Sequence, residues 1–240
     1  MLTVLDLFSG IGGFSLGLER TGGFKTVAFC EIDPFCRKVL AKHWPGVPIY
    51  EDVQLLTADK LAADGIRPDV ICGGFPCQDI SAMGRRMGLT GHRSGLWEYF
   101  SRAIGYLEPT FVIVENVAAL NFRGLGRVLS DLAALGYDAE WHVIPAAALG
   151  APHERERCWI IAYPKSLARI YQPHLAKAAA RLLNEPIAWD ACPWETPEAG
   201  VCGVDDGIPD RVVRTEKLGN AVVPQIPELI GRAILAAEAA

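Results

Sequence analysis

The 240-residue sequence lacks two features that would place it at a membrane or outside the cell. No apolar run reaches the roughly 20 residues that a membrane-spanning helix needs. The first residues, "MLTVLDLFSG", have no basic region ahead of their apolar stretch, which a secretory signal would carry. We therefore expect a cytoplasmic protein that has no membrane partner.

The cysteines lack the spacing of a metal site. They lie at positions 30, 36, 72, 77, 158, 192 and 202, and no two of them form a C-x-x-C pair. Structural zinc sites are built from such pairs, so we expect no bound metal. Most of these thiols are expected to be small buried apolar side chains.

Two nucleotide-binding patterns are also missing. No G-K-[S/T] sequence is present, and the glycine loop "DLFSGIGG" has Ser15 where G-x-G-x-x-G needs its last glycine. The loop itself follows an apolar run and precedes a helical stretch, so a ligand could approach its backbone at a helix N-terminus. By itself this pattern fits a nucleotide, a dinucleotide, S-adenosylmethionine or an ordinary strand-to-helix turn.

Acidic residues close the next two predicted strands. Glu31 could accept hydrogen bonds from both ribose hydroxyls of an adenosine, and Asp52 could accept one from the adenine amino group. Three successive strand ends therefore carry groups that suit an adenosine cofactor. Together with the missing patterns, this favours S-adenosylmethionine over NAD or ATP.

Short apolar runs alternate with amphipathic stretches through the first half of the chain. This alternation predicts an α/β fold with a mostly parallel sheet covered on both faces. Strands are expected at 2–8, 25–31, 48–52, 69–74 and 110–117, and helices at 14–22, 33–44, 95–107 and 123–136. Asp33 and Pro34 have the positions of an N-cap and a first helical residue.

The alternation ends after Gly136. The runs "YDAEWHVIPA" and "RCWIIAYP" predict two strands antiparallel to each other. We expect a catalytic domain over 1–163, a small target-recognition lobe over 164–216 that begins with a helix, and a C-terminal segment over 217–240 that returns to the first domain. The last segment contains a predicted helix at about 223–238.

The charge distribution is uneven. The net charge is −5, yet residues 76–185 carry 12 Lys and Arg against 10 Asp and Glu, while the flanks carry 11 against 18. This local basic surplus is compatible with a cleft that binds nucleic acid. A mixed solvated surface would give the same numbers.

Three further motifs carry reactive or charged side chains at strand ends. Cys77 lies in "GGFPCQDIS" after the fourth strand, and Glu115 lies in "ENV" at the end of the fifth. Arg155 and Arg157 alternate in "ERER" as the chain enters a later strand, so both should face one way. Taken singly, each has an ordinary explanation in packing or solvation, but their joint placement beside the glycine loop points to an active site.

The chain resembles the DNA (cytosine-5) methyltransferases. The resemblance rests on eight stretches in the family's order, which cover nearly the whole chain outside 164–216: "DLFSGIGG", "CEID", "ED", "GGFPCQDIS", "RSGLWEYFSRAI", "FVIVENV", "LGAPHERERCWIIA" and "LGNAVVPQI". One departure is His153, where the family's Q-x-R-x-R segment has glutamine. The resemblance implies a Rossmann-like S-adenosylmethionine-dependent fold with a small variable target-recognition lobe.

The resemblance also implies roles for particular residues. Cys77 would attack C6 of a flipped-out cytosine, Glu115 would hold N3 and the exocyclic amine, Arg155 would contact O2, and Arg157 would support the site. The cofactor would be S-adenosylmethionine. Its site would be lined by Phe8, Ser9, Gly10, Gly12, Glu31, Ile32, Asp52, Val53, Pro76, Leu96 and Asn220.

The resemblance implies double-stranded DNA as the partner, contacted by Arg85, Arg86, Arg93, Lys165 and Arg169. A monomer of prokaryotic or phage origin is expected, with a restriction-modification system as one setting and a separate protein as a possible aid to target recognition. An RNA cytosine methyltransferase is an alternative, but the Cys-Phe-Thr stretch of that branch is missing. A non-catalytic DNA-binding relative and a nicotinamide oxidoreductase fit the motifs less well.

Overall fold

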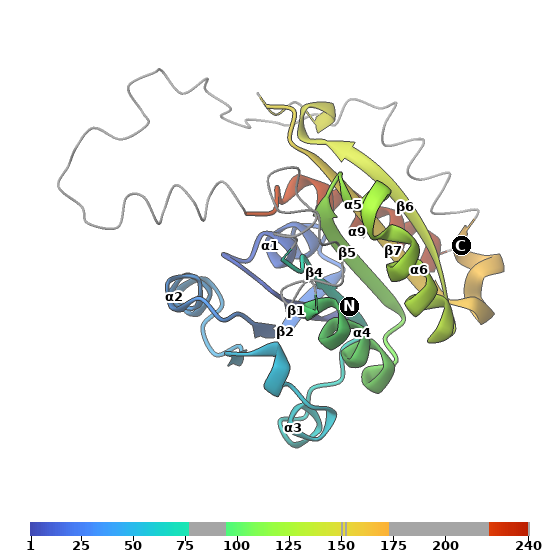
Figure 1. Ribbon diagram of the computed structural model, residues 1–240. Helices are drawn as coiled ribbons and strands as arrows, with labels where there is room; N and C mark the ends of the chain where they lie inside the picture. Colours follow the sequence, from blue (N-terminus) through green and yellow to red (C-terminus); the bar gives the residue numbers. More distant parts are fainter. Residues whose placement is uncertain (77–94, 150, 152, 173–220, 240) are drawn as a thin grey trace, which may run out of the picture.

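The computed structural model describes residues 1–76, 95–149, 151, 153–172 and 221–239 (Figure 1). Seven strands form one sheet in the order β3-β2-β1-β4-β5-β7-β6. Their bounds are β1 Leu2–Leu7, β2 Phe24–Cys30, β3 Ile49–Tyr50, β4 Val70–Gly73, β5 Phe111–Val117, β6 Tyr137–Pro145 and β7 Glu156–Pro164. The first five strands are parallel, and β7 pairs antiparallel with both β5 and β6. The predicted mostly parallel sheet with an antiparallel hairpin is confirmed.

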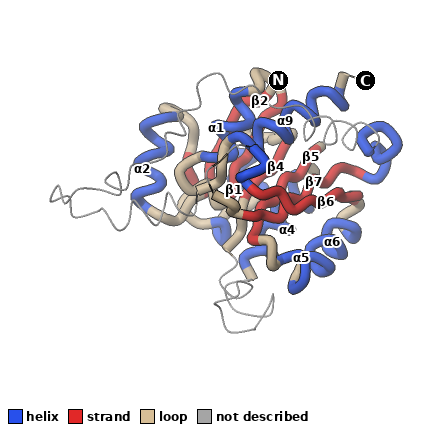
Figure 2. The backbone as a smooth tube through the Cα atoms, turned by 90° about the horizontal axis from the view of Figure 1, so that it is seen from above, coloured by secondary structure: helices blue, strands red, loops and turns tan. Residues whose placement is uncertain are grey.

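Helices cover both faces of the sheet (Figure 2). Their bounds are α1 Gly13–Arg20, α2 Pro34–His43, α3 Ala58–Ala63, α4 Leu96–Leu107, α5 Leu120–Arg123, α6 Leu125–Ala134 and α9 Gln225–Glu238, with short 3-10 turns at Val53–Leu55, Ala146–Leu149 and Lys165–Leu167. Helices α1 and α9 cover one face, and α4, α5 and α6 cover the other. The central strands β4 and β5 are therefore buried on both sides, as their continuous apolar sequences predicted.

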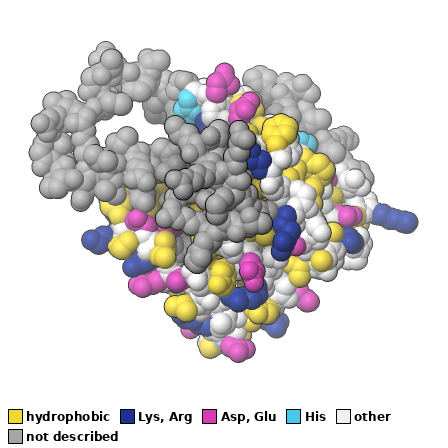
Figure 3. All heavy atoms as spheres, in the orientation of Figure 1, with side chains coloured by type: hydrophobic (Ala, Val, Ile, Leu, Met, Phe, Trp, Pro, Cys, Tyr) yellow, Lys and Arg dark blue, Asp and Glu magenta, His cyan; other side chains and the backbone are white. Residues whose placement is uncertain are grey.

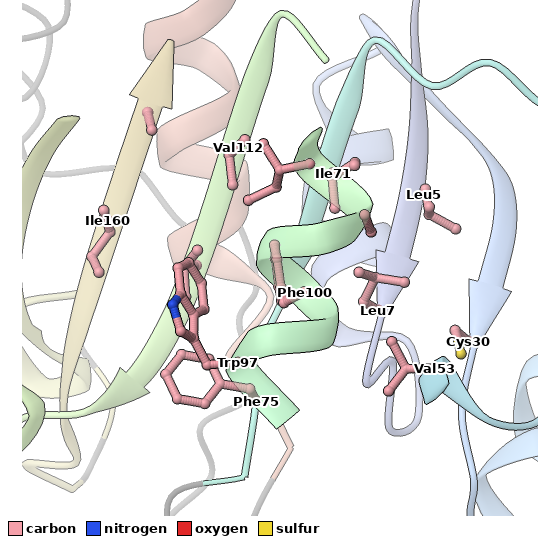
Figure 4. Packing of buried hydrophobic residues seen from close by; sticks show 14 of the residues in the cluster. Leu5, Leu7, Cys30, Val53, Ile71, Phe75, Trp97, Phe100, Val112 and Ile160 are labelled. Atoms are coloured by element: carbon pink, nitrogen blue, oxygen red, sulfur yellow. The ribbon is translucent and has the colours of Figure 1, made fainter. Parts of the chain in front are cut away.

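The core beneath α4 contains a cluster of aromatic side chains (Figure 4). Trp97 stacks on Phe100 at a centroid distance of 5.5 Å, and Phe75, which follows β4, lies 5.4 Å from Trp97. These rings pack against Ile71 and Val112 of the central strands. Burying side chains of this size stabilises a fold by about 1.5–3 kcal/mol each, so the cluster fixes the strand ends where Phe75 begins the next loop.

Helix α2 begins as its sequence predicted. Asp33 is its N-cap, and its Oδ1 accepts hydrogen bonds from the backbone N–H groups of Phe35 at 2.9 Å and Cys36 at 3.0 Å. Pro34 occupies the first helical position, where no backbone donor is needed. The turn after β2 is thereby fixed, and with it the position of Glu31.

Helix α3 was not predicted from the sequence. It has only six residues, so "ADKLAA" shows no clear periodicity, and it buries only Leu61. Its start does carry a recognisable signal, because Thr57 caps it by accepting a hydrogen bond from Lys60 N–H at 3.2 Å.

The chain after β7 lies on the main body. Residues 168–172 are helical, and Tyr171 is buried 4.8 Å from the ring of Phe111, with its hydroxyl bonded to the Glu238 carboxylate of α9. The predicted lobe over 164–216 falls mostly on residues outside the described part of the chain. The predicted first helix of that lobe is thus seen only as a short stretch packed on the sheet.

Helix α9 packs against α1. The backbone leading into it crosses α1 at two glycines one turn apart. A Cβ on Gly13 would lie 2.5 Å from the Val222 carbonyl oxygen, and one on Gly17 would lie 2.1 Å from that of Pro224. Glycine at both positions is therefore what allows residues 222–224 to lie directly on the first helix.

The outer strand β6 leaves large apolar side chains exposed. Trp141 and Val143 are 45% and 38% exposed, and Phe122 on α5 is 86% exposed. Figure 3 shows yellow side chains gathered over these two elements. In the part of the chain that the structure describes, β6 pairs on one side only, so this end of the sheet is an open strand edge.

Asp6 is a fully buried carboxyl near the end of β1. Its Oδ2 accepts a hydrogen bond from Ser15 Oγ on α1 at 2.8 Å, and burial raises its pKa to about 8. The folded protein therefore keeps this proton up to about pH 8, whereas the unfolded chain loses it near the ordinary value of 3.8. Between these values the free energy of unfolding must fall as pH rises, by up to about 1.4 kcal/mol per pH unit.

We expect Asp6→Asn to remove this pH dependence, because the amide keeps the shape and carries no titrating proton. Urea denaturation at pH 5, 6, 7 and 8 measures the effect. Asp59→Asn on the exposed side of α3 serves as the control. Its free energy of unfolding should change with pH as that of the wild type does. If the free energy of unfolding of Asp6→Asn fell with pH as steeply as that of the wild type, Asp6 would not be the group that holds the proton.

Candidate active site

A cleft of about 530 Å³ lies at the carboxyl ends of the parallel strands. This is where open α/β sheets bind their ligands. The residues that line it come from the ends of β1 to β5 and the segments that follow them, from the start of β7 and from the segment before α9: Phe8, Gly10, Cys30, Glu31, Ile32, Asp33, Cys36, Glu51, Asp52, Val53, Gln54, Gly74, Phe75, Pro76, Leu96, Glu115, Asn116, Val117, Arg157 and Ala221. Most of the described residues that the sequence assigned to a cofactor are thus brought together.

The glycine loop presents one glycine to the cleft. Gly10 has φ +54° and an empty space where a Cβ would stand, whereas a Cβ on Gly12 would lie 2.6 Å from the ring of Trp44. Gly12 therefore makes room for Trp44 of the neighbouring turn. Ser9 lies beneath the loop and bonds to Asp6 and Cys30 of the two strands, so it supports the loop from within.

Glu31 is held in a fixed position at the edge of the cleft. Its Oε2 accepts the Gly10 N–H at 2.7 Å, its Oε1 accepts the Asp33 N–H at 2.8 Å, and the residue is only 9% exposed. A carboxylate oxygen can accept more than one hydrogen bond. Glu31 can therefore accept from a ligand's hydroxyl groups without losing its bonds to the backbone.

The rest of this end of the cleft is acidic and apolar. Asp52 caps the turn at Val53–Leu55 through its Oδ1, which accepts the Gln54 N–H at 2.9 Å. The guanidinium of Arg37 lies at the rim, where it pairs with Glu51 at 3.2 Å and donates to the Ile32 carbonyl at 2.8 Å. Carboxylates repel a phosphate and attract hydroxyl, amino or cationic groups, so the lining fits an adenosine without phosphates.

The other end of the cleft contains Glu115 at the end of β5. Its Oε1 pairs with Arg157 Nε at 2.9 Å. Burial raises the pKa of the Glu115 carboxyl, and the positive charges of Arg157 and Arg155 oppose that rise. A Cβ on Gly74 would lie 2.7 Å from Glu115 Oε2, so glycine at that position leaves room for the carboxylate.

Asn116 connects the two strands that meet at this end. It is 2% exposed, and its Nδ2 donates to the Phe75 carbonyl at 3.0 Å while its Oδ1 accepts the Val117 N–H at 2.9 Å. Phe75 and Pro76 are the last described residues before Cys77. Asn116 and Gly74 therefore set the start of the cysteine loop, a role that sequence reasoning did not assign to them although both lie inside the quoted motifs.

The two arginines of the later motif bond to different partners. Arg157 lines the cleft, whereas Arg155 lies before β7 with φ +28° and donates from Nη2 to the Ala221 carbonyl at 2.6 Å. Regular alternation would have put both on one face of a strand. The strand begins only at Glu156, so Arg155 lies outside the regular alternation that the prediction assumed.

Lys165 and Arg169 lie at the opposite edge of the sheet from the cleft. The Lys165 ammonium donates to the Ala133 carbonyl at the end of α6, and β7 has by then run back past the start of β5. Figure 1 shows this segment at the right margin. The structure does not bring these two residues to the candidate active site. Cys77, Arg85, Arg86, Arg93 and Asn220 lie outside the described residues.

The position of Glu31 leads to a test of the adenosine end. We expect Glu31→Gln to weaken S-adenosylmethionine binding about ten-fold or more, because a hydrogen bond to a charged, partly buried acceptor contributes about 1.5–3 kcal/mol. Isothermal titration calorimetry measures the affinity. Glu108→Gln, at the exposed far end of α4, is the matched control. Equal affinity in both folded variants would remove Glu31 from the site.

Solved structures with the same architecture place the fold in a class. A "putative DNA modification methyltransferase encoded within prophage" from E. coli matches 71% of this chain and 50% of its own at a TM-score of 0.59 and 30% identity. The DNMT2 of Spodoptera frugiperda matches 70% of this chain and 51% of its own at 0.58 and 20% identity, a likeness of fold. The fold and the cleft define an α/β protein of the S-adenosylmethionine-dependent methyltransferase class.

Sequence relatives identify the family. Residues 2–188 match the model of the C-5 cytosine-specific DNA methylases. The type II methyltransferase M.Eco47II of Escherichia coli is 37% identical over 69% of this chain and 40% of its own length, and M2.BsuMI of Bacillus subtilis is 35% identical over 67% and 42%. M.AquIA of Picosynechococcus is 31% identical over 66% of this chain and 70% of its own. The chain belongs to the C-5 cytosine-specific DNA methylase family, whose methyl donor is S-adenosylmethionine.

The first two of these relatives are much longer, since the matched part makes up less than half of their length. Among the described residues, no group of histidine, cysteine and acidic side chains has the geometry of a metal site. Nor does that part of the chain contain a helix with the length and apolar character needed to cross a membrane.

Proposed function

We propose that the chain transfers a methyl group from S-adenosylmethionine to C5 of a flipped-out cytosine in DNA. The observation that carries this proposal is the single cleft that contains both Glu31 and the Glu115–Arg157 pair. The end that suits an adenosine and the polar, partly buried end are thus parts of one cleft. Pro76 lines the same cleft, and Cys77 is the next residue in the sequence.

The residues at the acidic end fit the cofactor. S-adenosylmethionine supplies a methyl group bonded to a positively charged sulfur, and the surrounding carboxylates suit that charge. Gly10 offers open backbone and Glu31 offers a fixed acceptor. The residues proposed to hold the cofactor are Phe8, Ser9, Gly10, Gly12, Glu31, Ile32, Asp52, Val53, Pro76, Leu96 and Asn220, of which Ser9 and Gly12 act through the loop's shape.

The chemistry at the other end follows from the poor nucleophilicity of cytosine C5. Attack of the Cys77 thiolate on C6 forms an S–C6 bond and breaks the C5–C6 double bond, which makes C5 electron-rich. C5 then takes the methyl group as the methyl–sulfonium bond breaks. Loss of the C5 proton restores the double bond and expels the thiolate. Glu115 would hold N3 and the exocyclic amine, and its raised pKa favours a proton available to N3.

The base must leave the duplex to reach this cleft, because a paired cytosine is not accessible from both faces. Double-stranded DNA is therefore the proposed partner, and the bacterial or phage-infected cytoplasm is the proposed place of action. Arg85, Arg86 and Arg93 of the cysteine loop are proposed to contact it. For Lys165 and Arg169 to contact the same duplex, the DNA would have to reach the other edge of the sheet.

We also propose that the target is short. Residues 164–216, proposed as the target-recognition region, are few, and each well-placed pair of hydrogen bonds to a base edge contributes only about 1–3 kcal/mol to specificity. Phosphate contacts would then supply most of the affinity, which should fall steeply with salt. The alternative is that a second protein supplies recognition.

One experiment tests both the function and the length of the target. The purified protein alone is incubated with random-sequence DNA and S-adenosylmethionine. Bisulfite sequencing then identifies the methylated cytosines. We expect methylated cytosines in one short common context. A long consensus would contradict the short target, methylation only after a second protein is added would favour the partner, and methylated RNA without methylated DNA would overturn the substrate.

A further inference from the structure

We propose that Arg155 is a positioning residue that fastens the C-terminal segment, Ala221–Glu238, to the candidate active site. Its role is then different from that of Arg157, although the two belong to one short motif. The inference rests on the proposed function only where it concerns the cofactor. The attachment itself is a property of the fold.

The backbone at Arg155 explains how two nearby arginines come to serve different partners. In an extended strand, residues two apart point to the same face. The φ of +28° at Arg155 interrupts that geometry immediately before β7. Arg157 can therefore pair with Glu115 while the Arg155 guanidinium reaches the Ala221 carbonyl at 2.6 Å.

The bonded carbonyl belongs to the cleft. Ala221 is one of the residues that line it, and it is the first described residue of the returning segment. Arg155 thus joins the start of β7 to a wall of the cleft made by a segment far away in the sequence. The bond is partly buried, and a guanidinium donor bonds more strongly than a neutral one.

The residues after Ala221 are fixed from the opposite side. The backbone of Val222 and Pro224 lies on Gly13 and Gly17 of α1, with no space for a side chain between them. Helix α1 starts directly after the glycine loop, whose Gly10 bonds to Glu31. The segment is therefore held between Arg155 at one side and the cofactor-binding loop's own helix at the other.

This arrangement couples two regions of the cleft. If Arg155 no longer held Ala221, residues 221–224 would lose a fixed support, and the cleft wall would move away from the cofactor end. The expected defect is weaker cofactor binding. Loss of Arg157, in contrast, removes the partner of Glu115 and affects the base end.

Hydrogen exchange and calorimetry on the full chain separate the two roles. We expect Arg155→Ala to speed amide exchange over 222–228 and to weaken S-adenosylmethionine binding by about ten-fold, the usual effect of losing a charge-assisted hydrogen bond. Arg155→Lys, which keeps a donor, should restore part of both. Arg157→Ala should leave the exchange and the affinity at wild-type values while lowering methyl transfer.

A second variant approaches the same segment from the other side. Gly17→Ala puts a methyl group against the Pro224 carbonyl, yet alanine favours the helix that contains it. Faster exchange over 222–228 together with weaker cofactor binding would therefore come from the displaced segment. This variant tests whether displacement of the segment weakens cofactor binding even if Arg155→Ala fails to fold.

The proposal is overturned if Arg155→Ala keeps wild-type exchange and affinity but loses methyl transfer as Arg157→Ala does, because Arg155 would then act on the base. It is also overturned if Gly17→Ala loosens the segment without any effect on the cofactor. If the wild type methylates no DNA, the proposed function fails. Exchange over 222–228 still decides whether Arg155 holds the segment.

Discussion

Cys77→Ser should lose methyl transfer by a factor on the order of 10⁴ or more while it keeps S-adenosylmethionine binding. A serine hydroxyl is not ionised at neutral pH and is a far weaker nucleophile than a thiolate, and removing a reacting group has effects of this size. Transfer of a labelled methyl group to DNA measures the first quantity, and calorimetry measures the second.

The cysteines in the described part of the chain provide the control for Cys77. Burial raises the thiol pKa of Cys158 to about 11 and that of Cys30 to about 12, so neither forms a thiolate readily. Cys158→Ala should therefore keep its activity after allowance for stability. DNA containing 5-fluorocytosine should trap the wild type, because fluorine at C5 cannot leave as the proton does. An adduct mapped to any residue except Cys77 would refute the assignment.

Glu115→Gln should lower the turnover number by about 10²- to 10⁴-fold, the range found for groups that transfer or hold a proton in a transition state. The amide keeps the shape of the side chain but cannot give a proton to cytosine N3, and it leaves the Arg157 charge without its partner. Single-turnover methylation measures the chemical step. Glu140→Gln on β6, whose amide oxygen can still accept the hydrogen bond from the Tyr163 hydroxyl, is the control.

The pH profile gives a second reading of Glu115. Burial raises the pKa of this carboxyl, so the protonated form persists to higher pH than in an exposed glutamate. A step that needs this proton is complete at low pH and is lost as pH rises through the raised pKa. Glu115→Gln should remove that alkaline decline. A variant with wild-type turnover would show that Glu115 has no part in the reaction.

The sequence predicted the sheet because its evidence is local. Continuous apolar runs such as "DVIC" and "FVIVENV" are typical of strands buried on both faces, and the cap formed by Asp33 and Pro34 depends only on adjacent residues. The position of Glu31 follows from the same logic, since it ends one of these strands. The sequence was therefore sufficient to predict that Glu31 lies at the cleft.

Other features depend on contacts between distant segments. Gly12 makes room for Trp44, and Gly13 and Gly17 make room for residues 222–224, which no local pattern reveals. The direction of Arg155 depends on one backbone angle that regular alternation does not anticipate. The place of Lys165 depends on the antiparallel course of β7, which carries the chain away from the cleft.

The packing of α9 and the residues before it against α1 has a consequence for synthesis on the ribosome. The strands and the glycine loop leave the ribosome before Ala221 and the residues that lie on Gly13 and Gly17, because the last described strand, β7, already ends at Pro164. A nascent chain can therefore form its parallel strands well before the wall of the cleft exists. Cofactor affinity should be acquired only when α9 and the residues before it meet α1, and a chain truncated before Ala221 should bind the cofactor weakly.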